Sequence, residues 1–310
     1  MGNKVNRQSR PPAVLRASFP PPHYKPIWRP VTERCPKIHK IVESGNVNKV
    51  KSFIEKGGDI NKTDVNGLTA LHCAVLNNEE EMVEMLLAAG SQLQCCRLYF
   101  SPIHFAVQTG NLNIVRMLIN HGDSVNCSDL VGNTPLSLSI EFNHADITRL
   151  LIYKKAYITS KYLFLSVENG SLEISKLLIL NRPSIIFNLS LARYRFTHKS
   201  IPCLKLLAFV GIKFNVEEFV TCNRPLKFSE MVLGEQILLP PPHYDRHKDI
   251  QSFSEFIEWL KNKTNKPLSL QNLCLLAFYS FCGDRSVENV LSHFHGLPKL
   301  ITSYLLLETF

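Results

Sequence analysis

No stretch of this sequence is apolar for long enough to cross a membrane as a helix. Such a helix needs about 18 or more consecutive apolar residues, and polar side chains interrupt every apolar run before that length is reached. The nine cysteines include no Cys-x-x-Cys pair, and we expect no secretory leader before them. An odd number of cysteines in such a chain indicates a reducing compartment. We therefore expect a protein of the cytoplasm, or of both cytoplasm and nucleus, without a membrane span.

Catalytic patterns are also missing. The sequence has no phosphate-binding glycine loop, and no nucleophile, base and orienting group occur at a recognisable spacing. Cys95 and Cys96 are adjacent, but a metal site would need further ligands at matching spacing. We therefore expect neither an enzyme nor a bound metal or cofactor.

The positive charge is concentrated at the start of the chain. The formal net charge is +9, from 35 Lys and Arg against 26 Asp and Glu. Residues 1–37 hold eight basic residues against one acidic residue, together with eight of the 18 prolines, which predicts a disordered basic tail. The remaining residues hold 27 basic against 25 acidic groups. This nearly neutral body offers no basic face for nucleic acid.

A Pro-Pro-x-Tyr sequence occurs twice, at 21–24 and at 241–244. Proline-rich segments bind aromatic-lined grooves because the polyproline conformation is already populated before binding. Pro21, Pro22 and Tyr24 are therefore candidate ligands of WW domains. The second copy can equally act as a stiff connector between domains.

A repeat with a period of 32–33 residues extends over residues 38–155. The copy at 101–126 shows two short apolar stripes on either side of Gly110, which can adopt the left-handed conformation that ends a helix. Copies that begin near Ile38, Leu71 and Asn133 repeat the pattern. Neither short helix can bury its stripe alone, so the copies must stack.

This pattern, with its Thr-Pro-Leu-His-x-Ala-like opening, resembles the ankyrin repeat, a β-turn plus two antiparallel helices. The resemblance implies an all-α solenoid of helix pairs with β-hairpin fingers over residues 38–214. Two later copies, 161–182 and 201–214, are degenerate. The first begins about six residues early, which predicts a shortened hairpin before it.

Three histidines, His39, His72 and His104, recur at one position of successive copies. Residues one repeat apart are too far from each other to share a metal ion. The ankyrin resemblance implies instead a structural histidine that is hydrogen-bonded within its own turn.

Arg97, Leu98 and Tyr99 lie where a hairpin tip is expected. Hairpin tips and inner helices form the concave wall of such stacks, and exposed Tyr and Arg are frequent binding hot spots. We therefore predict that these residues contact a client protein. Packing of Leu98 or Tyr99 on a neighbouring repeat is an equally good interpretation.

The end of the chain divides into a connector, residues 215–266, and a C-terminal module, residues 267–310. In the connector, residues 253–260 predict a short amphipathic helix. The module has three short apolar patterns: the first ends at Gly283, Ser286 can cap the second, and Leu297 and Pro298 open the third. So small a core needs a partner, or the repeats, to cover its remaining apolar face.

This module resembles the SOCS box. The resemblance lies in Ser269-Leu270-x-x-Leu273-Cys274 and in Leu297-Pro298-Lys299-Leu300. It implies that elongin C is contacted by Leu270, Leu273, Cys274 and Phe278, and a cullin scaffold by Leu297, Pro298 and Leu300. Leu275 stands where the family commonly has arginine, and His295-Gly296 where it has a first Leu-Pro.

From about residue 38 onward the chain resembles the ankyrin-repeat and SOCS-box proteins. The resemblance implies a non-catalytic substrate receptor of a cullin–RING ubiquitin ligase, whose repeats hold an unidentified client and whose module docks on elongins B and C. Two alternatives stay open. The chain can be a plain ankyrin scaffold whose tail recruits WW-domain proteins, or the module can be a helical cap on the last repeat.

Overall fold

The computed structural model describes residues 36–93, 100–188, 198–210, 255, 258, 275, 277–280, 282–293 and 299–307. All regular structure in these residues is helical, and none of them lies in a strand. The chain forms two compact units, Met1–Gln92 and Leu93–Phe310. The predicted all-α class is confirmed for the described residues, where the hairpin fingers are tight turns rather than strand pairs.

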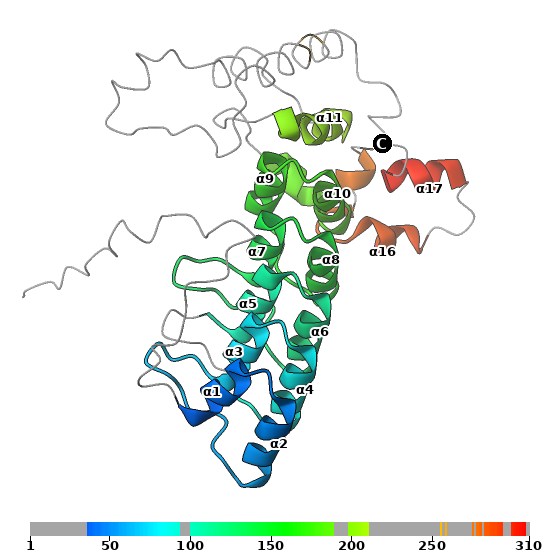
Figure 1. Ribbon diagram of the computed structural model, residues 1–310. Helices are drawn as coiled ribbons and strands as arrows, with labels where there is room; N and C mark the ends of the chain where they lie inside the picture. The colour runs from blue at the N-terminus through cyan, green and yellow to red at the C-terminus, as the bar shows by residue number, and fades with distance from the viewer. Residues whose placement is uncertain are drawn as a thin grey trace, which may run out of the picture. The chain divides into compact units, whose positions relative to one another are not determined.

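The first unit contains two antiparallel helix pairs (Figure 1). The helices are α1 (Lys37–Glu43), α2 (Val47–Glu55), α3 (Ala70–Leu76) and α4 (Glu80–Ala88). The repeat pattern places Leu71, Met82 and Leu86 inward, and all three have no exposed surface. The period therefore predicted the buried face of α3 and α4, whereas Phe53 and Ile54 of α2 are only half-buried.

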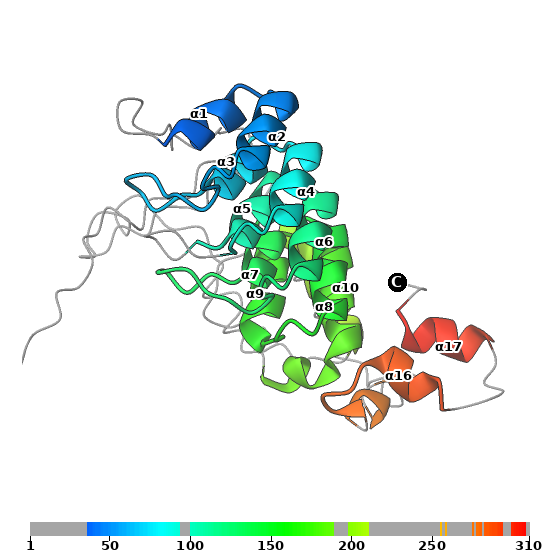
Figure 2. The ribbon, with the colours of Figure 1, turned by 90° about the horizontal axis from the view of Figure 1, so that it is seen from below.

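The second unit continues the same pattern and adds the C-terminal helices. Its helix pairs are α5 (Pro102–Thr109) with α6 (Leu112–Asn120), α7 (Pro135–Glu141) with α8 (Ala145–Tyr153), and α9 (Ser160–Glu168) with α10 (Leu172–Asn181). Figures 1 and 2 show α5, α7 and α9 in one row and α6, α8 and α10 in a second row. A 3₁₀ segment (Pro183–Asn188), a 3₁₀ turn (His198–Ser200) and α11 (Ile201–Val210) follow. The last two helices are α16 (Val287–Leu291) and α17 (Lys299–Leu305).

The α5–α6 pair forms where the sequence predicts it, because both helices have strong local end signals. Ser101 precedes Pro102, whose ring presets the backbone angle of the first helical residue. Gly110 ends α5 with φ 78°, in the left-handed region that glycine adopts without a steric penalty. The side chain of Asn111 then accepts a hydrogen bond from the backbone N–H of Ile114 at 3.0 Å, which caps α6.

The three repeated histidines are buried and structural, as predicted. The Nδ1 atom of His72 accepts a hydrogen bond from the Thr69 N–H, and that of His104 accepts one from the Ser101 N–H, each at 3.1 Å. The structure adds a second role, since the Nε2 atom of His39 lies 2.8 Å from the Leu68 carbonyl oxygen. This bond joins one repeat to the next. Burial lowers the pKa of His104, so its imidazole stays neutral at physiological pH.

The connection between α8 and α9 is shorter than the connections between the preceding helix pairs, as the early start of the fifth copy predicts. It spans residues 154–159, whereas α6 and α7 are joined by residues 121–134. The longer connection holds a tight turn at Asp129 to Gly132, and the shorter one has no room for such a finger. No finger covers the repeats at residues 154–159, so other parts of the chain can contact the repeats there.

Gly170 provides a test of how closely the degenerate repeat is packed. We expect Gly170→Ala to destabilise the protein more than Gly57→Ala, because both glycines are left-handed (φ 71° and 69°) but only Gly170 is crowded. A Cβ atom at Gly170 would lie 2.4 Å from the backbone oxygen of Lys199, while one at Gly57 would meet nothing within 4 Å. Each substitution has a backbone cost of about 1–2 kcal/mol. Equal shifts in the urea midpoint for the two variants would contradict this packing.

Candidate functional site

The tight turn between α6 and α7 exposes two large apolar side chains at its tip. The Asp129 carboxylate accepts hydrogen bonds from the N–H groups of Val131 (2.9 Å) and Asn133 (2.7 Å), which holds the turn closed. Leu130 is 56% exposed and Val131 61% exposed. Exposed apolar residues on a stiff turn are suited to a protein interface. The sequence contains a signal for this turn, an Asp followed three residues later by Gly, which our sequence analysis did not use.

The predicted client residues Arg97, Leu98 and Tyr99 lie outside the described residues, so their contacts stay a prediction. The same holds for Pro21, Pro22 and Tyr24 of the tail. Leu130 and Val131 belong to the next turn along the chain and add a candidate contact that the sequence analysis missed.

The C-terminal module has its own small core around Tyr279. Leu275 and Tyr279 have no exposed surface and Cys282 has 1%, so the first helix turns this face inward. The Tyr279 hydroxyl donates a hydrogen bond to the Leu305 carbonyl oxygen of α17 at 2.9 Å. From α16, Val287 and Val290 are also buried, and Ser286 caps that helix as predicted by accepting from the Asn289 N–H at 3.3 Å. All three helices of the module thus contribute buried side chains, and α16 also contacts α10.

The residues predicted to contact elongin C lie mainly outside the described part of the chain. This holds for Leu270, Leu273 and Cys274, whereas Phe278 is described and half-buried. Ala277, which the sequence places on the same stripe, is exposed. The described residues of this stripe are therefore not the residues that form the buried core of the module.

The predicted cullin residues are described only in part. Leu297 and Pro298 lie outside the described residues, and Leu300 lies within α17. Ile301, which the sequence placed on one stripe with Leu305, is 44% exposed, while Leu305 is buried. The apolar stripe of α17 is therefore only partly covered by this chain.

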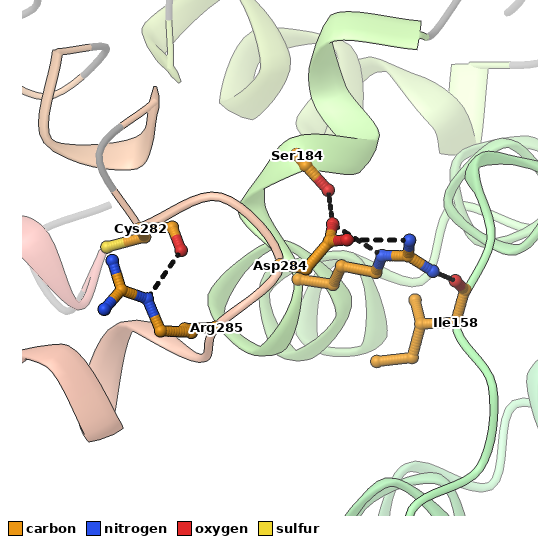
Figure 3. A network of polar contacts seen from close by, with 6 residues as sticks. Ile158, Ser184, Cys282, Asp284 and Arg285 are labelled. Atoms are coloured by element: carbon orange, nitrogen blue, oxygen red, sulfur yellow. Dashed lines mark hydrogen bonds and ion pairs between the residues drawn. The ribbon is translucent and has the colours of Figure 1, made fainter.

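A polar network joins the module to the end of α10 (Figure 3). The Arg182 guanidinium contacts both oxygens of the Asp284 carboxylate, at 3.0 and 3.2 Å, and donates a further bond to the Ile158 carbonyl oxygen. The Ser184 hydroxyl donates to Asp284, and the Ser184 N–H donates to the Gly283 carbonyl oxygen at 3.1 Å. We call Arg182, Ser184 and Asp284 the Arg182 network. It links residues about one hundred positions apart and was not predicted from sequence.

Hydrogen bonding and burial shift the pKa values of one carboxyl group and two thiols in the second unit. Hydrogen bonds from Arg182 and Ser184 lower the pKa of Asp284, so its carboxylate is ionised throughout the neutral range. Burial raises the pKa of the Cys282 thiol, and burial raises that of Cys203 to about 11. Thiols with a raised pKa are poor nucleophiles. Within the described part of the chain, no group of three His, Cys, Asp or Glu side chains could hold a metal ion, and no helix is long and apolar enough to cross a membrane.

Comparison with known families decides what the helix pairs are. Family models described as ankyrin repeats match residues 38–87 and residues 92–162. These residues are ankyrin repeats. The α9–α10 pair continues the geometry of the matched pairs although most of it lies beyond the matched residues.

Relatives of known sequence match less than half of this chain. A fowlpox virus protein named as an ankyrin repeat protein, FPV223, is 26% identical over 117 residues, which are 38% of this chain and 82% of the relative. A Saccharomyces cerevisiae protein named as the 26S proteasome regulatory subunit p28 is 32% identical over 38% of this chain and 53% of its own length. The palmitoyltransferase Hip14 of Drosophila melanogaster is 29% identical over 31% of this chain. The chain spans only 15% of the length of Hip14, so the similarity does not extend to a whole enzyme.

The Arg182 network makes a prediction about the junction between the ankyrin repeats and the module. We expect Asp284→Ala to speed hydrogen exchange at the Ser184 amide, because its acceptor Gly283 is then held less firmly. Since the pKa of Asp284 is lowered, the network is complete at neutral pH and is lost as pH falls through the lowered pKa. The difference in exchange rate at the Ser184 amide between the wild type and Asp284→Ala should therefore become smaller at acidic pH.

Arg149→Ala is the matched control for this exchange experiment. Arg149 and Glu173 form another exposed ion pair at 3.0 Å, between α8 and α10, and neither residue belongs to the Arg182 network. Its removal should leave exchange at Ser184 unchanged. An equal increase in both variants would show that the Arg182 network does not hold the junction.

Proposed function

We propose that this chain is the substrate-recognition subunit of a cullin–RING ubiquitin ligase. Ankyrin repeats are protein-interaction modules, and here they would hold the client. The C-terminal module would dock on elongin C, and through it on elongin B, the cullin and the RING protein. The chain itself would carry out no chemistry.

The observation that carries this proposal is that the described residues of the first module helix bury one stripe and leave Ala277, on another side, exposed. Leu275, Tyr279 and Cys282 lie within one narrow stripe, and all three are buried. At about 100° per residue, a helix continued backward would place Leu270 and Cys274 on the side of the exposed Ala277, well away from the buried stripe. An apolar stripe that the chain's own core does not use is suited to insertion into a partner's groove.

The position of Leu275 supports the same interpretation. It departs from the arginine common at this place in the SOCS-box family, and it is fully buried. Leucine in place of arginine therefore adds buried apolar surface to the inward face of the helix. It does not alter the side on which Leu270 and Cys274 are expected. We propose that elongin C still binds although Leu275 replaces the arginine that is common in the family.

The proposed mechanism is proximity. A client held on the ankyrin repeats has its lysines near the thioester of a ubiquitin-conjugating enzyme, which raises the effective concentration of the reacting groups. A defined junction between repeats and module favours this, because a loose junction would spread the client over a larger volume. The Arg182 network is such a junction.

Co-expression with elongins B and C tests the proposal. We expect the affinity-tagged full chain to co-purify with both elongins at a constant ratio through gel filtration. A chain that is folded and monomeric but brings down no elongin would rule out the ligase function and favour the cap or the scaffold. Recruitment of WW-domain proteins by the tail stays a prediction of the sequence alone.

A further inference from the structure

Helix α11 buries more of its side chains than the second helices of the earlier pairs. In α4, α8 and α10 the buried residues stand at four positions of the helix, i, i+1, i+4 and i+5. α11 buries the same four positions and also Leu206 and Val210, which have no exposed surface. The residues equivalent to Leu206 in the earlier helices are only half-buried: Met85, Met117, Leu150 and Leu177. An additional apolar side of α11 is therefore covered.

An ordinary neighbouring repeat does not account for this burial. In the described residues, α11 packs on α10 and on the 3₁₀ turn that precedes it, and Figure 1 shows α11 beyond α9 and α10 at the end of the repeats. In α8, which packs against α6 and α10, Leu150 stays half-buried. A following repeat of the same geometry would thus not bury Leu206 completely. Leu206 and Val210 therefore require a part of this chain that packs more closely on α11.

The connector helix, residues 253–260, has the properties of this cover. Glu255 and Glu258 are helical and exposed, so one side of this predicted helix faces solvent. At about 100° per residue, its apolar residues lie on the opposite side: Phe253, Phe256, Ile257 and Leu260. A short amphipathic helix is stable in water only when its apolar side is buried. Residues 211–252 join α11 to this helix, and at about 3.3 Å per extended residue they are long enough to return along α11.

We propose that the connector helix docks its apolar side on Leu206 and Val210 and forms the C-terminal cap of the ankyrin repeats. A stack of repeats needs a terminal element with a polar outer side, and Glu255 and Glu258 supply that side. This inference goes beyond the ligase proposal and does not depend on elongin docking. It assigns the cap to the connector instead of the C-terminal module. The end of the repeats is then occupied, so a client binds elsewhere on them.

Photo-cross-linking of the full chain tests where the connector helix docks. Phe256 is replaced by p-benzoylphenylalanine, which keeps an aromatic ring on the apolar side. Irradiation of the purified chain without elongins should join position 256 to residues 201–210 of the same chain, and the product should run as a monomer. The same photoreactive group in place of Glu258, on the exposed side, should give no such product.

Hydrogen exchange tests whether this contact protects α11. We expect Phe256→Ser combined with Ile257→Ser to speed exchange in residues 201–210 at least about tenfold, because the cover of α11 is lost. The matched control combines Glu255→Ser with Glu258→Ser, which places two serines on the exposed side of the same helix. It should leave exchange in α11 within about twofold of the wild type. Helices α5 to α8 should keep their protection in both variants.

Two kinds of result would overturn the proposal. One is failure of position 256 to label α11, whether the label falls on residues 275–307, on a second copy of the chain or nowhere. The other is equal exchange in α11 for the two double variants, which would mean that another segment, such as residues 189–197, covers Leu206 and Val210. Neither result bears on elongin co-purification, so the ligase proposal is tested separately.

Discussion

The double variant Leu270→Ala, Cys274→Phe will not co-purify with elongins. The two residues are four positions apart, which in a helix is about one turn, so on the predicted helix both can enter one pocket from one face. Loss of a buried leucine costs about 2–4 kcal/mol, from its transfer free energy and the void it leaves. A phenylalanine at position 274 adds a steric conflict where a small side chain is expected. The affinity should therefore fall by at least about a hundredfold, at ~1.4 kcal/mol per tenfold.

The control for this variant is the folded state of the rest of the chain. The buried stripe of Leu275, Tyr279 and Cys282 is unchanged, so the module core and the ankyrin repeats should keep their unfolding midpoint. Circular dichroism during thermal unfolding would measure this midpoint. If the repeats unfold when these two residues are changed, the first module helix is a structural cap and the ligase proposal is wrong.

Tyr279→Ala should unfold the C-terminal module and leave the ankyrin repeats folded. Tyr279 is the largest of the fully buried side chains in the described residues, and its hydroxyl holds α17 through the Leu305 carbonyl oxygen. Truncation of a buried aromatic residue to alanine costs about 3–5 kcal/mol. A core of this size cannot absorb that loss. Hydrogen exchange should show lost protection in residues 275–307, together with loss of elongin co-purification.

Tyr279→Phe isolates the hydroxyl from the ring. It keeps the packing and removes only the hydrogen bond to Leu305, at an expected cost of about 1–3 kcal/mol because a buried carbonyl loses its partner. Elongins should still co-purify with this variant, with reduced protection at α17. Retention of full module protection in Tyr279→Ala would contradict the core described here.

The repeats were predictable because their signals are local. The 32–33-residue period, the left-handed Gly110 and the early start of the fifth copy each correspond to an observed helix, helix end or short connection. Burial within a helix pair depends on side chains a few positions apart, which a periodic pattern reports directly. The module helices were placed for the same reason, and Ser286 is a helix cap as its sequence position indicated.

The inward face of the first module helix could not be read from the sequence. That helix is apolar on two sides, and the periodic pattern drew attention to the Leu270 and Cys274 side rather than to Leu275 and Tyr279. Periodicity shows that a stripe exists but not which stripe the chain covers by itself. Only the position of α17 against Tyr279 decides between them.

The sequence by itself determined the repeat architecture and indicated one apolar stripe of the first module helix. The tertiary structure decided the contacts between segments far apart in the chain, namely the Arg182 network and the hydrogen bond from the buried Tyr279 to Leu305. The physical reason is the range of the interactions. Helix formation and capping depend on neighbours within about one turn, whereas an ion pair between Arg182 and Asp284 exists only once packing has brought the two residues together.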